Sequence, residues 1–206
     1  MGSYIHIIRH GLTEGNIKKL FYGTRDLPLA PEGRRQLEDL ISEDIYPRPE
    51  NPDYYATDLI RSQQTLEMIY GKQDFRLLNG LKEIDCGEYE MKTAEELEKE
   101  PEFRRWVEDN GSDVRPPGGE SVKEFRQRVR SQFKELTGLH RLKDMSVRHN
   151  KKDANSIVVC HGGAIGAIMF DCFPGLHDDL WHWIPPTGRG YTLIMDHGEV
   201  IDYCPI

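Results

Sequence analysis

Two short, continuous apolar runs stand out in the hydrophobicity pattern of the chain, at residues 4–8 and 157–160. Runs of this length are typical of strands that are buried on both faces of a sheet. The first run is followed by Arg9-His10-Gly11 and the second by His161-Gly162. Further short strands and a closing hairpin, with Gly198 in its turn, are predicted at residues 53–56, 75–78, 190–195 and 200–203.

Between the strands, apolar residues recur at helical spacing. Thr57 is predicted to cap a helix that Gly71 ends, and Ser121 with Glu124 forms the capping box of a longer helix. Residues 140–155 are basic and polar, and this pattern indicates an exposed connection. The first predicted helix begins at a Pro-Glu pair, the next two at a capping residue, and the last follows Gly162-Gly163. They cover residues 31–41, 57–70, 121–136 and 164–173.

Strands and helices alternate along the chain, as they do in α/β proteins. This order predicts a single domain over residues 1–206, with a three-layer α/β/α architecture and a mostly parallel central sheet. The segment from about residue 86 to residue 121 does not fit the alternation, because it is acidic and helical only in pieces, at 93–100 and 101–109. We therefore expect this segment to form a small helical lid beside the functional site.

The composition narrows the class of protein. Charged residues make up 30% of the chain, and no apolar run approaches the roughly 20 residues that span a bilayer, which excludes a membrane protein. The first residues lack the basic and apolar regions of a secretory signal. Four cysteines without Cys-x-x-Cys spacing indicate reduced thiols and a cytoplasmic location: Cys86, Cys160, Cys172 and Cys204.

The net charge of −8, from 35 acidic and 27 basic residues, argues against nucleic acid as a partner, because a phosphate backbone binds to a basic surface. The candidate site is nevertheless locally basic. The carboxyl ends of parallel strands meet at one edge of a sheet, so we expect His10 and His161 to lie together there with Arg9 and Arg61. Cations gathered in an acidic protein indicate a small anionic ligand in a pocket.

The loop at residues 9–16 carries the residue types that hold an oxyanion. Arg9 offers a planar fork of donors that matches phosphate oxygens, and two glycines in the loop let backbone N–H groups approach a ligand. A neutral imidazole at His10 suits attack on a phosphomonoester dianion, because it has no negative charge to be repelled. The loop therefore predicts phosphoryl chemistry.

The motifs of the chain support this prediction. The loop reads R-H-G-x-T-x-x-N, and the series continues through residues 23–29, residues 57–65, Glu83 and His161-Gly162-Gly163. In these motifs the chain resembles the histidine phosphatase superfamily, the phosphoglycerate-mutase-like group, over most of its length. The resemblance implies that family's α/β/α fold with a lid and a covalent phosphohistidine intermediate. It implies no metal and no other cofactor, since arginines supply the charge that magnesium provides elsewhere.

The resemblance also assigns roles to residues of this chain. His10 is the expected nucleophile, and Glu83 is the expected acid that protonates the leaving oxygen and then activates water. Arg9, Arg61 and His161 complete the catalytic set, and the phosphate-binding set is Arg9, Asn16, Arg61, His161 and Gly162. Trp181 and Trp183 belong to a local cluster that we assign to the core or the rim. Thr13 is equally well explained as a residue that satisfies its own loop; the candidate substrate contacts are Thr13, Phe21, Tyr22, Gly23 and Tyr89.

Within this superfamily, residues 83–91 are closer to the phosphatase form E-x-x-F-G-x-W-E-G than to the mutase form E-R-x-x-G-x-L-x-G. Residues 117–121 match a segment common in phosphatases such as alpha-ribazole phosphatase. We therefore expect a metal-independent phosphomonoester hydrolase that acts on a small phosphorylated metabolite, with no nucleic-acid or membrane partner. The alternatives are a cofactor-dependent phosphoglycerate mutase and a non-catalytic phospho-ligand-binding or regulatory module. A zinc hydrolase needs ligand spacing such as His-x-x-x-His, which the sequence lacks.

Overall fold

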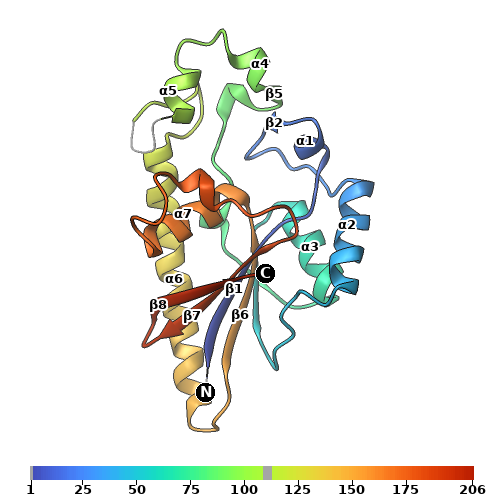
Figure 1. The fold of residues 1–206 in the computed structure, drawn as a ribbon, viewed down its shortest axis with the longest axis vertical. Helices are drawn as coiled ribbons and strands as arrows, with labels where there is room; N and C mark the ends of the chain where they lie inside the picture. Colours follow the sequence, from blue (N-terminus) through green and yellow to red (C-terminus); the bar gives the residue numbers. More distant parts are fainter. Residues whose placement is uncertain (1, 109–112) are drawn as a thin grey trace.

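The computed structural model describes residues 2–108 and 113–206, and a six-stranded sheet lies at its centre (Figure 1). The strand order is β4-β3-β6-β1-β7-β8. The first four of these strands are parallel, and β7 and β8 pair antiparallel. The predicted fold, with the closing hairpin as its antiparallel part, is confirmed. The strands are β1 Ser3–Arg9, β3 Asp53–Ala56, β4 Arg76–Leu77, β6 Ala154–Cys160, β7 Gly190–Asp196 and β8 Glu199–Pro205, and β2 Leu20–Phe21 with β5 Lys92–Thr93 forms a second, two-stranded sheet.

Helices cover both faces of the central sheet. On one face, Ile5 and Ile7 of β1 pack in a core with the helices α6 and α7, and on the other Ile8 packs with Leu37 and Leu66 of α2 and α3. The alternation along β1 therefore fills two cores, which explains why its sequence reads as a continuous apolar run. The helices are α1 Glu14–Ile17, α2 Pro31–Ser42, α3 Ile60–Tyr70, α4 Ala94–Leu97, α5 Phe103–Glu108, α6 Val122–Arg148 and α7 Gly162–Cys172, with 3-10 turns η1 Asn79–Leu81, η2 Gly87–Tyr89 and η3 Leu180–Trp183.

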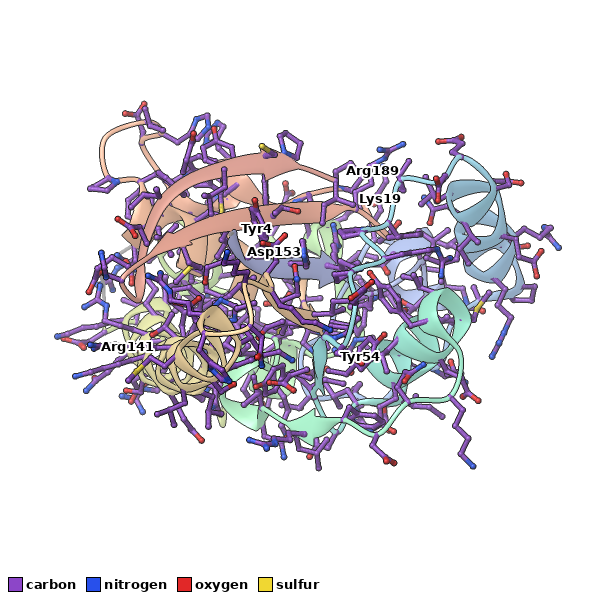
Figure 2. All side chains as sticks on the ribbon, turned by 90° about the horizontal axis from the view of Figure 1, so that it is seen from below. Tyr4, Lys19, Tyr54, Arg141, Asp153 and Arg189 are labelled. Carbon is purple, nitrogen blue, oxygen red and sulfur yellow. The ribbon has the colours of Figure 1, made fainter. Side chains whose placement is uncertain are left out.

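The register between β1 and β6 positions the candidate site. Arg9 lies opposite Cys160, so the next residue of each strand, His10 and His161, leaves the sheet at the same height. The backbone N–H of His10 donates to the carbonyl of Cys160 at 3.0 Å and extends the ladder by one step. Figure 2 views the sheet from its opposite edge, where Tyr4 and Asp153 lie near the beginnings of the two strands.

The segment predicted as a lid contains η2, β5, α4 and α5, which lie beyond the carboxyl edge of the sheet (Figure 1). Strand β5 pairs with β2 and so ties this segment to the loop that follows β1. The two predicted helical pieces are shorter than expected, at Ala94–Leu97 and Phe103–Glu108. The last residue of the second piece, Asp109, lies outside the described residues. None of the helices in residues 2–108 and 113–206 combines the length and the apolar character needed to cross a membrane.

Thr57 does not cap α3, contrary to the prediction. The helix begins two residues later than expected for such a cap, with Leu59 in the cap position and no side-chain bond from it. The first N–H of the helix, that of Ile60, donates instead to the carboxylate of Asp26 at 2.7 Å. Because a residue distant in the sequence satisfies the helix end, the hydroxyl of Thr57 is left to bond His161 and Ser62, each at 2.9 Å.

The predicted exposed connection at residues 140–155 is confirmed only for residues 149–153, which join α6 to β6, and is wrong for the rest. Helix α6 continues to Arg148, and His140 and Asp144 follow Leu136 at four-residue spacing along its buried stripe. His140 is only 1% exposed, and its two ring nitrogens bond the hydroxyls of Ser156 at 2.8 Å and Ser3 at 2.9 Å. A polar pattern predicts exposure, but His140 is buried because its hydrogen-bond partners are buried serines of β1 and β6.

This buried histidine makes the stability of the fold depend on pH. Burial lowers the pKa of His140 from 6.5 to about 4, so the unfolded chain binds more protons than the folded chain between these values. The contribution is fully present above about pH 6.5 and is lost as the pH falls toward 4. At pH 5 the loss relative to pH 7.5 is about 2 kcal/mol for this residue alone.

Urea unfolding of the native protein and of His140→Gln, each at pH 7.5 and pH 5, tests this effect. Glutamine retains hydrogen-bonding groups for the two serines but does not titrate. The free energy of unfolding of the variant should therefore fall by about 2 kcal/mol less between the two pH values than that of the native protein. Equal losses in both proteins would remove His140 as the source of the acid sensitivity.

Candidate active site

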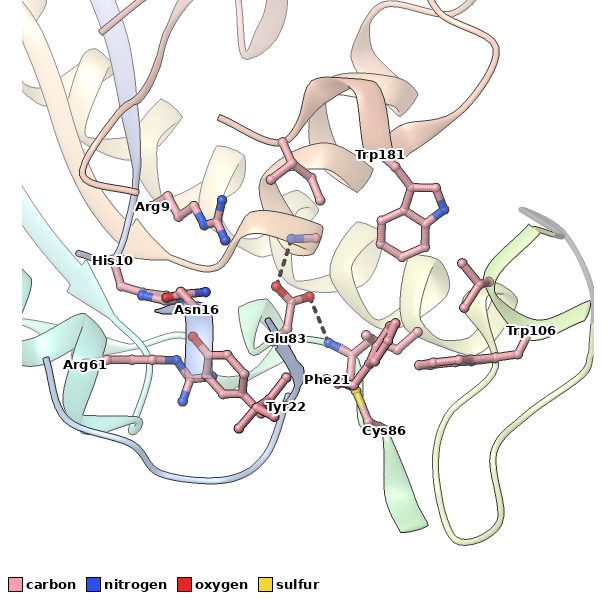
Figure 3. A pocket seen from close by; sticks show the side chains of 15 residues that line it. Arg9, His10, Asn16, Phe21, Tyr22, Arg61, Glu83, Cys86, Trp106 and Trp181 are labelled. Carbon is pink, nitrogen blue, oxygen red and sulfur yellow. Dashed lines mark hydrogen bonds between the residues drawn. The ribbon is translucent and has the colours of Figure 1, made fainter. Parts of the chain in front are cut away.

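A cavity of about 330 Å³ opens beyond the carboxyl ends of β1 and β6. Figure 3 shows Arg9, His10, Asn16 and Arg61 gathered at one end of it, with Glu83 beside them and two tryptophans at the other end. Ligands of open α/β sheets bind at this edge. The cavity wall consists of Arg9, His10, Asn16, Leu20, Phe21, Tyr22, Arg61, Glu83, Ile84, Cys86, Trp106, Val107, Gly163, Trp181 and Ile184.

The ring of His10 is held in one tautomer by its own loop. Its Nδ1 lies 2.7 Å from the carbonyl oxygen of Gly11, and because a carbonyl only accepts, Nδ1 carries the proton. Burial, together with the positive charges of Arg61 and Arg9, holds the pKa of His10 well below its ordinary value of 6.5. The imidazole is therefore neutral, and Nε2 has a free lone pair in a residue that lines the cavity.

His161 stands behind His10, with the two ring centroids 5.2 Å apart. It is fully buried and is not part of the cavity wall. Its Nε2 bonds the hydroxyl of Thr57 at 2.9 Å, and its Nδ1 has no hydrogen-bond partner. Burial, followed by the positive charge of Arg61, keeps the pKa of His161 well below its ordinary value, so this second imidazole is neutral as well.

Arg9 and Arg61 bring two guanidinium groups to the polar end of the cavity. Arg61 is fully buried in the first turn of α3, and it donates to the carbonyls of Arg25 and Gly23, both at 2.8 Å. Arg9 donates to the carbonyl of Pro185 at 2.8 Å. The Nε atom of each arginine is buried without a partner. Both side chains are thus fixed by carbonyl oxygens and keep donors for an oxyanion.

Asn16 reaches the cavity from the short helix α1. Its side-chain oxygen accepts from the backbone N–H of Thr13 at 3.1 Å, while the Thr13 hydroxyl accepts from the N–H of Asn16 at 3.3 Å. This capping box leaves the side-chain NH₂ of Asn16 as a donor. Thr13 itself is fully buried and bonds the hydroxyl of Tyr22 at 2.6 Å, so it supports the loop and lies outside the cavity wall.

Glu83 is oriented by two backbone N–H groups. Its Oε2 accepts from Gly163 at 2.9 Å and its Oε1 from Ile84 at 3.0 Å (Figure 3). A Cβ on residue 163 would lie 2.2 Å from this carboxylate, so only glycine allows the approach. The carboxylate stands at the middle of the cavity, between the arginines and the tryptophans.

Hydrogen bonds from Arg128 of α6 hold the backbone around Glu83 in place. Arg128 donates to the carbonyl of Glu83 at 3.2 Å and to the carbonyls of Gly80 and Lys82 at 2.9 and 3.1 Å. The same guanidinium forms a two-point ion pair with Glu120, at 2.9 and 2.7 Å. The position of the carboxylate is therefore determined by contacts between segments far apart in the sequence.

The structure brings most of the predicted site residues together and leaves some behind the wall. Gly23 serves through its backbone, with its carbonyl bonded to Arg61 and its N–H to Glu90, and Tyr89 packs in the lid against Phe103. Neither lines the cavity, and Gly162 lies against the side chain of Arg9. The predicted residues in the wall are Arg9, His10, Asn16, Phe21, Tyr22, Arg61 and Glu83.

Two tryptophans in the wall were missed as site residues. Trp106 comes from the lid helix α5, and Trp181, which we assigned to the core or the rim, comes from η3. Nothing in the sequence distinguishes a tryptophan that lines a cavity from one that fills a core. Only the tertiary arrangement of α5 and η3 beyond the sheet places them here.

Comparison with known proteins supports the family resemblance that the motifs predict. The chain is 28% identical over 181 residues to the 2,3-bisphosphoglycerate-dependent phosphoglycerate mutase of Mesorhizobium japonicum, covering 82% of this chain and 81% of that protein. The alpha-ribazole phosphatase of Shigella flexneri has a similar fold, with a TM-score of 0.75 at 20% identity, over 95% of this chain and 92% of the other. A Thermus thermophilus protein superposes with a TM-score of 0.68 at 26% identity, over 97% and 98%.

The sequence profile of the histidine phosphatase superfamily (branch 1) matches residues 5–201, nearly the whole chain. This match includes both strand-end histidines, both buried arginines and the carboxylate that the cavity brings together. The chain belongs to the histidine phosphatase superfamily.

Proposed function

We propose that this protein is a metal-independent phosphomonoester hydrolase that acts through a phosphohistidine at His10. The observation that carries the proposal is a neutral, buried imidazole whose Nδ1–H is bonded to a carbonyl, with a free Nε2 in the wall that also contains two guanidinium groups. This is the protonation state and the charge environment that in-line attack on a phosphate dianion requires.

In the first step, Nε2 of His10 attacks the phosphorus and the bond from phosphorus to the ester oxygen breaks. Glu83, protonated at this stage, transfers its proton to the leaving alcohol. Arg9, Arg61 and Asn16 donate to the phosphoryl oxygens, where charge is redistributed in the transition state. The ring of His161 packs against the ring of the nucleophile, with 5.2 Å between the two ring centroids.

In the second step, the Glu83 carboxylate takes a proton from water, and the water oxygen attacks the phosphorus as the bond to Nε2 breaks. Inorganic phosphate leaves, and both His10 and Glu83 return to their starting protonation states. The two bonds from Gly163 and Ile84 keep the carboxylate in one place for both proton transfers.

The charge of the cavity wall favours hydrolysis over a mutase reaction. A phosphoglycerate carries a carboxylate as well as a phosphoryl group, and a bisphosphate carries two phosphoryl groups. Among the described residues that line the cavity, the only cationic side chains are Arg9 and Arg61, and both lie at the phosphoryl end. A second anionic group on the substrate therefore has no counter-charge in this wall.

Phosphoglycerate mutase is the second candidate. The observation that favours it is the likeness to the Mesorhizobium japonicum mutase over most of both chains. The same nucleophile and the same acid serve both reactions, and what separates them is whether the phosphohistidine meets water or a bound acceptor.

Replacing His10 by alanine should abolish the covalent intermediate. When the native enzyme reacts with a ³²P-labelled substrate and is then quenched without acid, it should yield an acid-labile, base-stable phosphoenzyme. His10→Ala should lose this signal and turnover together, by on the order of 10³-fold or more. His149→Ala, at an exposed position after α6, is the matched control and should retain both. Near-normal turnover of the His10 variant would rule out this mechanism.

Replacing Glu83 by glutamine should slow substrates according to their leaving groups. An aliphatic alcohol needs a proton as it leaves, whereas p-nitrophenolate hardly does. The kcat of Glu83→Gln should therefore fall far more for an aliphatic phosphate than for p-nitrophenyl phosphate. The control Glu88→Gln, at an exposed position of the same segment, should leave this ratio unchanged. Equal losses on both substrates would remove Glu83 from the acid role.

A direct competition assay separates the two candidate reactions. With 3-phosphoglycerate and a priming amount of 2,3-bisphosphoglycerate, release of inorganic phosphate should exceed formation of 2-phosphoglycerate. Phosphate release from other monoesters should persist in EDTA. Formation of 2-phosphoglycerate that outruns phosphate release would make the mutase the correct function.

A further inference from the structure

The outer half of the cavity differs in chemistry from the inner half. Beyond Glu83 the wall is almost entirely apolar and comes from four separate segments: the loop with β2, the residue that follows Glu83, the lid helix α5 and the stretch around η3. In Figure 3, Trp181 lies on one side of this space, and Phe21 and Trp106 lie on the other. The apolar side chains are Leu20, Phe21, Ile84, Trp106, Val107, Trp181 and Ile184.

The aromatic pair on the lid side is held in place by its own contacts. The ring of Phe21 lies 6.0 Å from that of Trp106 and 5.2 Å, edge to face, from that of Phe103. The indole N–H of Trp106 donates to the carbonyl of Glu120 at 3.0 Å. Its one polar atom is thus occupied outside the cavity, and Trp106 offers the cavity only its apolar ring.

Three cations close to Glu83 line a second cavity and are paired with carboxylates. Lys82, Arg115 and Arg128 line this second cavity, which shares Glu83 with the first. They form ion pairs with Asp58 at 3.0 Å, Glu124 at 2.9 Å and Glu120 at 2.7 Å, respectively. The four lid residues outside the described ranges are Asp, Asn, Gly and Ser, so they add no cation.

The position of Glu83 fixes which part of a substrate meets the apolar wall. Glu83 stands between the phosphoryl end and the tryptophans, so the ester oxygen that it protonates points away from the arginines. The alcohol attached to that oxygen must then extend into the apolar half. With a volume of about 330 Å³, at the lower end of the roughly 300–1,000 Å³ usual for small-molecule sites, the cavity suits one phosphoryl group and one ring.

We infer that the substrates are phosphomonoesters of uncharged, ring-bearing alcohols, with the ring between Trp181 and the Phe21–Trp106 pair. The inference rests on the proposed hydrolase function and adds the class of leaving group to it. A flat ring buries apolar surface against three aromatic side chains, which a polyol or a carboxylate in the same place does not.

Three alkyl phosphates test this inference. Aryl phosphates are avoided because their phenolate leaving groups make them reactive whatever the wall binds. They are 2-phenylethyl phosphate, glycerol 3-phosphate and 3-phosphoglycerate, all esters of primary alcohols. From phosphate release, kcat/KM for 2-phenylethyl phosphate should exceed that for each of the other two by on the order of 100-fold. A polyol is at least as good a leaving group as 2-phenylethanol, so intrinsic reactivity works against the expected order.

Variants of the wall identify the source of the preference. Trp181→Ala should lower the ratio of kcat/KM for 2-phenylethyl phosphate to that for glycerol 3-phosphate by about tenfold or more, and Trp181→Phe should restore most of it. Val107→Lys, which brings a cation to the half-buried apolar wall, should raise kcat/KM for 3-phosphoglycerate and lower it for 2-phenylethyl phosphate. Met145→Ala, on the exposed side of α6, is the control and should change neither ratio.

The outcomes separate this inference from the proposed function. Phosphate release with the expected order of substrates, altered as stated by the Trp181 and Val107 variants, supports both. Phosphate release with glycerol 3-phosphate or 3-phosphoglycerate equal to or better than 2-phenylethyl phosphate overturns the inference and leaves the hydrolase function standing. A ratio that Trp181→Ala does not change also overturns it. No phosphate release from any monoester overturns the proposed function itself.

Discussion

Parallel, in-register pairing of β1 with β6 places the two imidazoles of the site side by side. Arg9 pairs with Cys160, and His10 and His161 follow at the same height beyond the last pair. A shift of one residue in either strand would exchange the residues that face the two cores, so the buried side chains on both faces enforce this register. Packing far from the cavity thus fixes the distance between His10 and His161, and the segments that carry Arg61, Asn16 and Glu83 surround that fixed pair.

Sequence reasoning succeeded where the signal is local. The strand at residues 3–9, the capping box at Ser121 and the turn at Gly198 each have their whole cause within a few residues. It failed where a partner comes from elsewhere. The carboxylate of Asp26 caps α3 from 34 residues away, and His140 is buried because Ser3 and Ser156 meet it from two strands. A pattern of apolar and polar letters cannot contain such long-range partners.

The same division applies to the site. The residues proposed to hold the phosphoryl group lie at strand ends and helix starts, and motifs at those places predicted His10, Arg9 and Arg61. The outer wall has no such signature, because Trp106 and Trp181 come from segments that the fold brings together only beyond the sheet. The motif that identified Glu83 also says nothing of Arg128 and Glu120, which hold its backbone.

The buried arginines have a consequence for the lifetime of the protein. Arg9 and Arg61 donate to carbonyl oxygens and keep an unpartnered Nε each, so their positive charges are compensated poorly within the fold. A buried ion of this kind costs several kcal/mol of folding free energy. The oxyanion of the proposed function would supply a counter-charge there and, because it would bind only the folded state, would stabilise the protein by mass action. Under the proposed function, abundant phosphate or substrate would thus protect the folded protein from unfolding and proteolysis, and depletion of both would remove this protection.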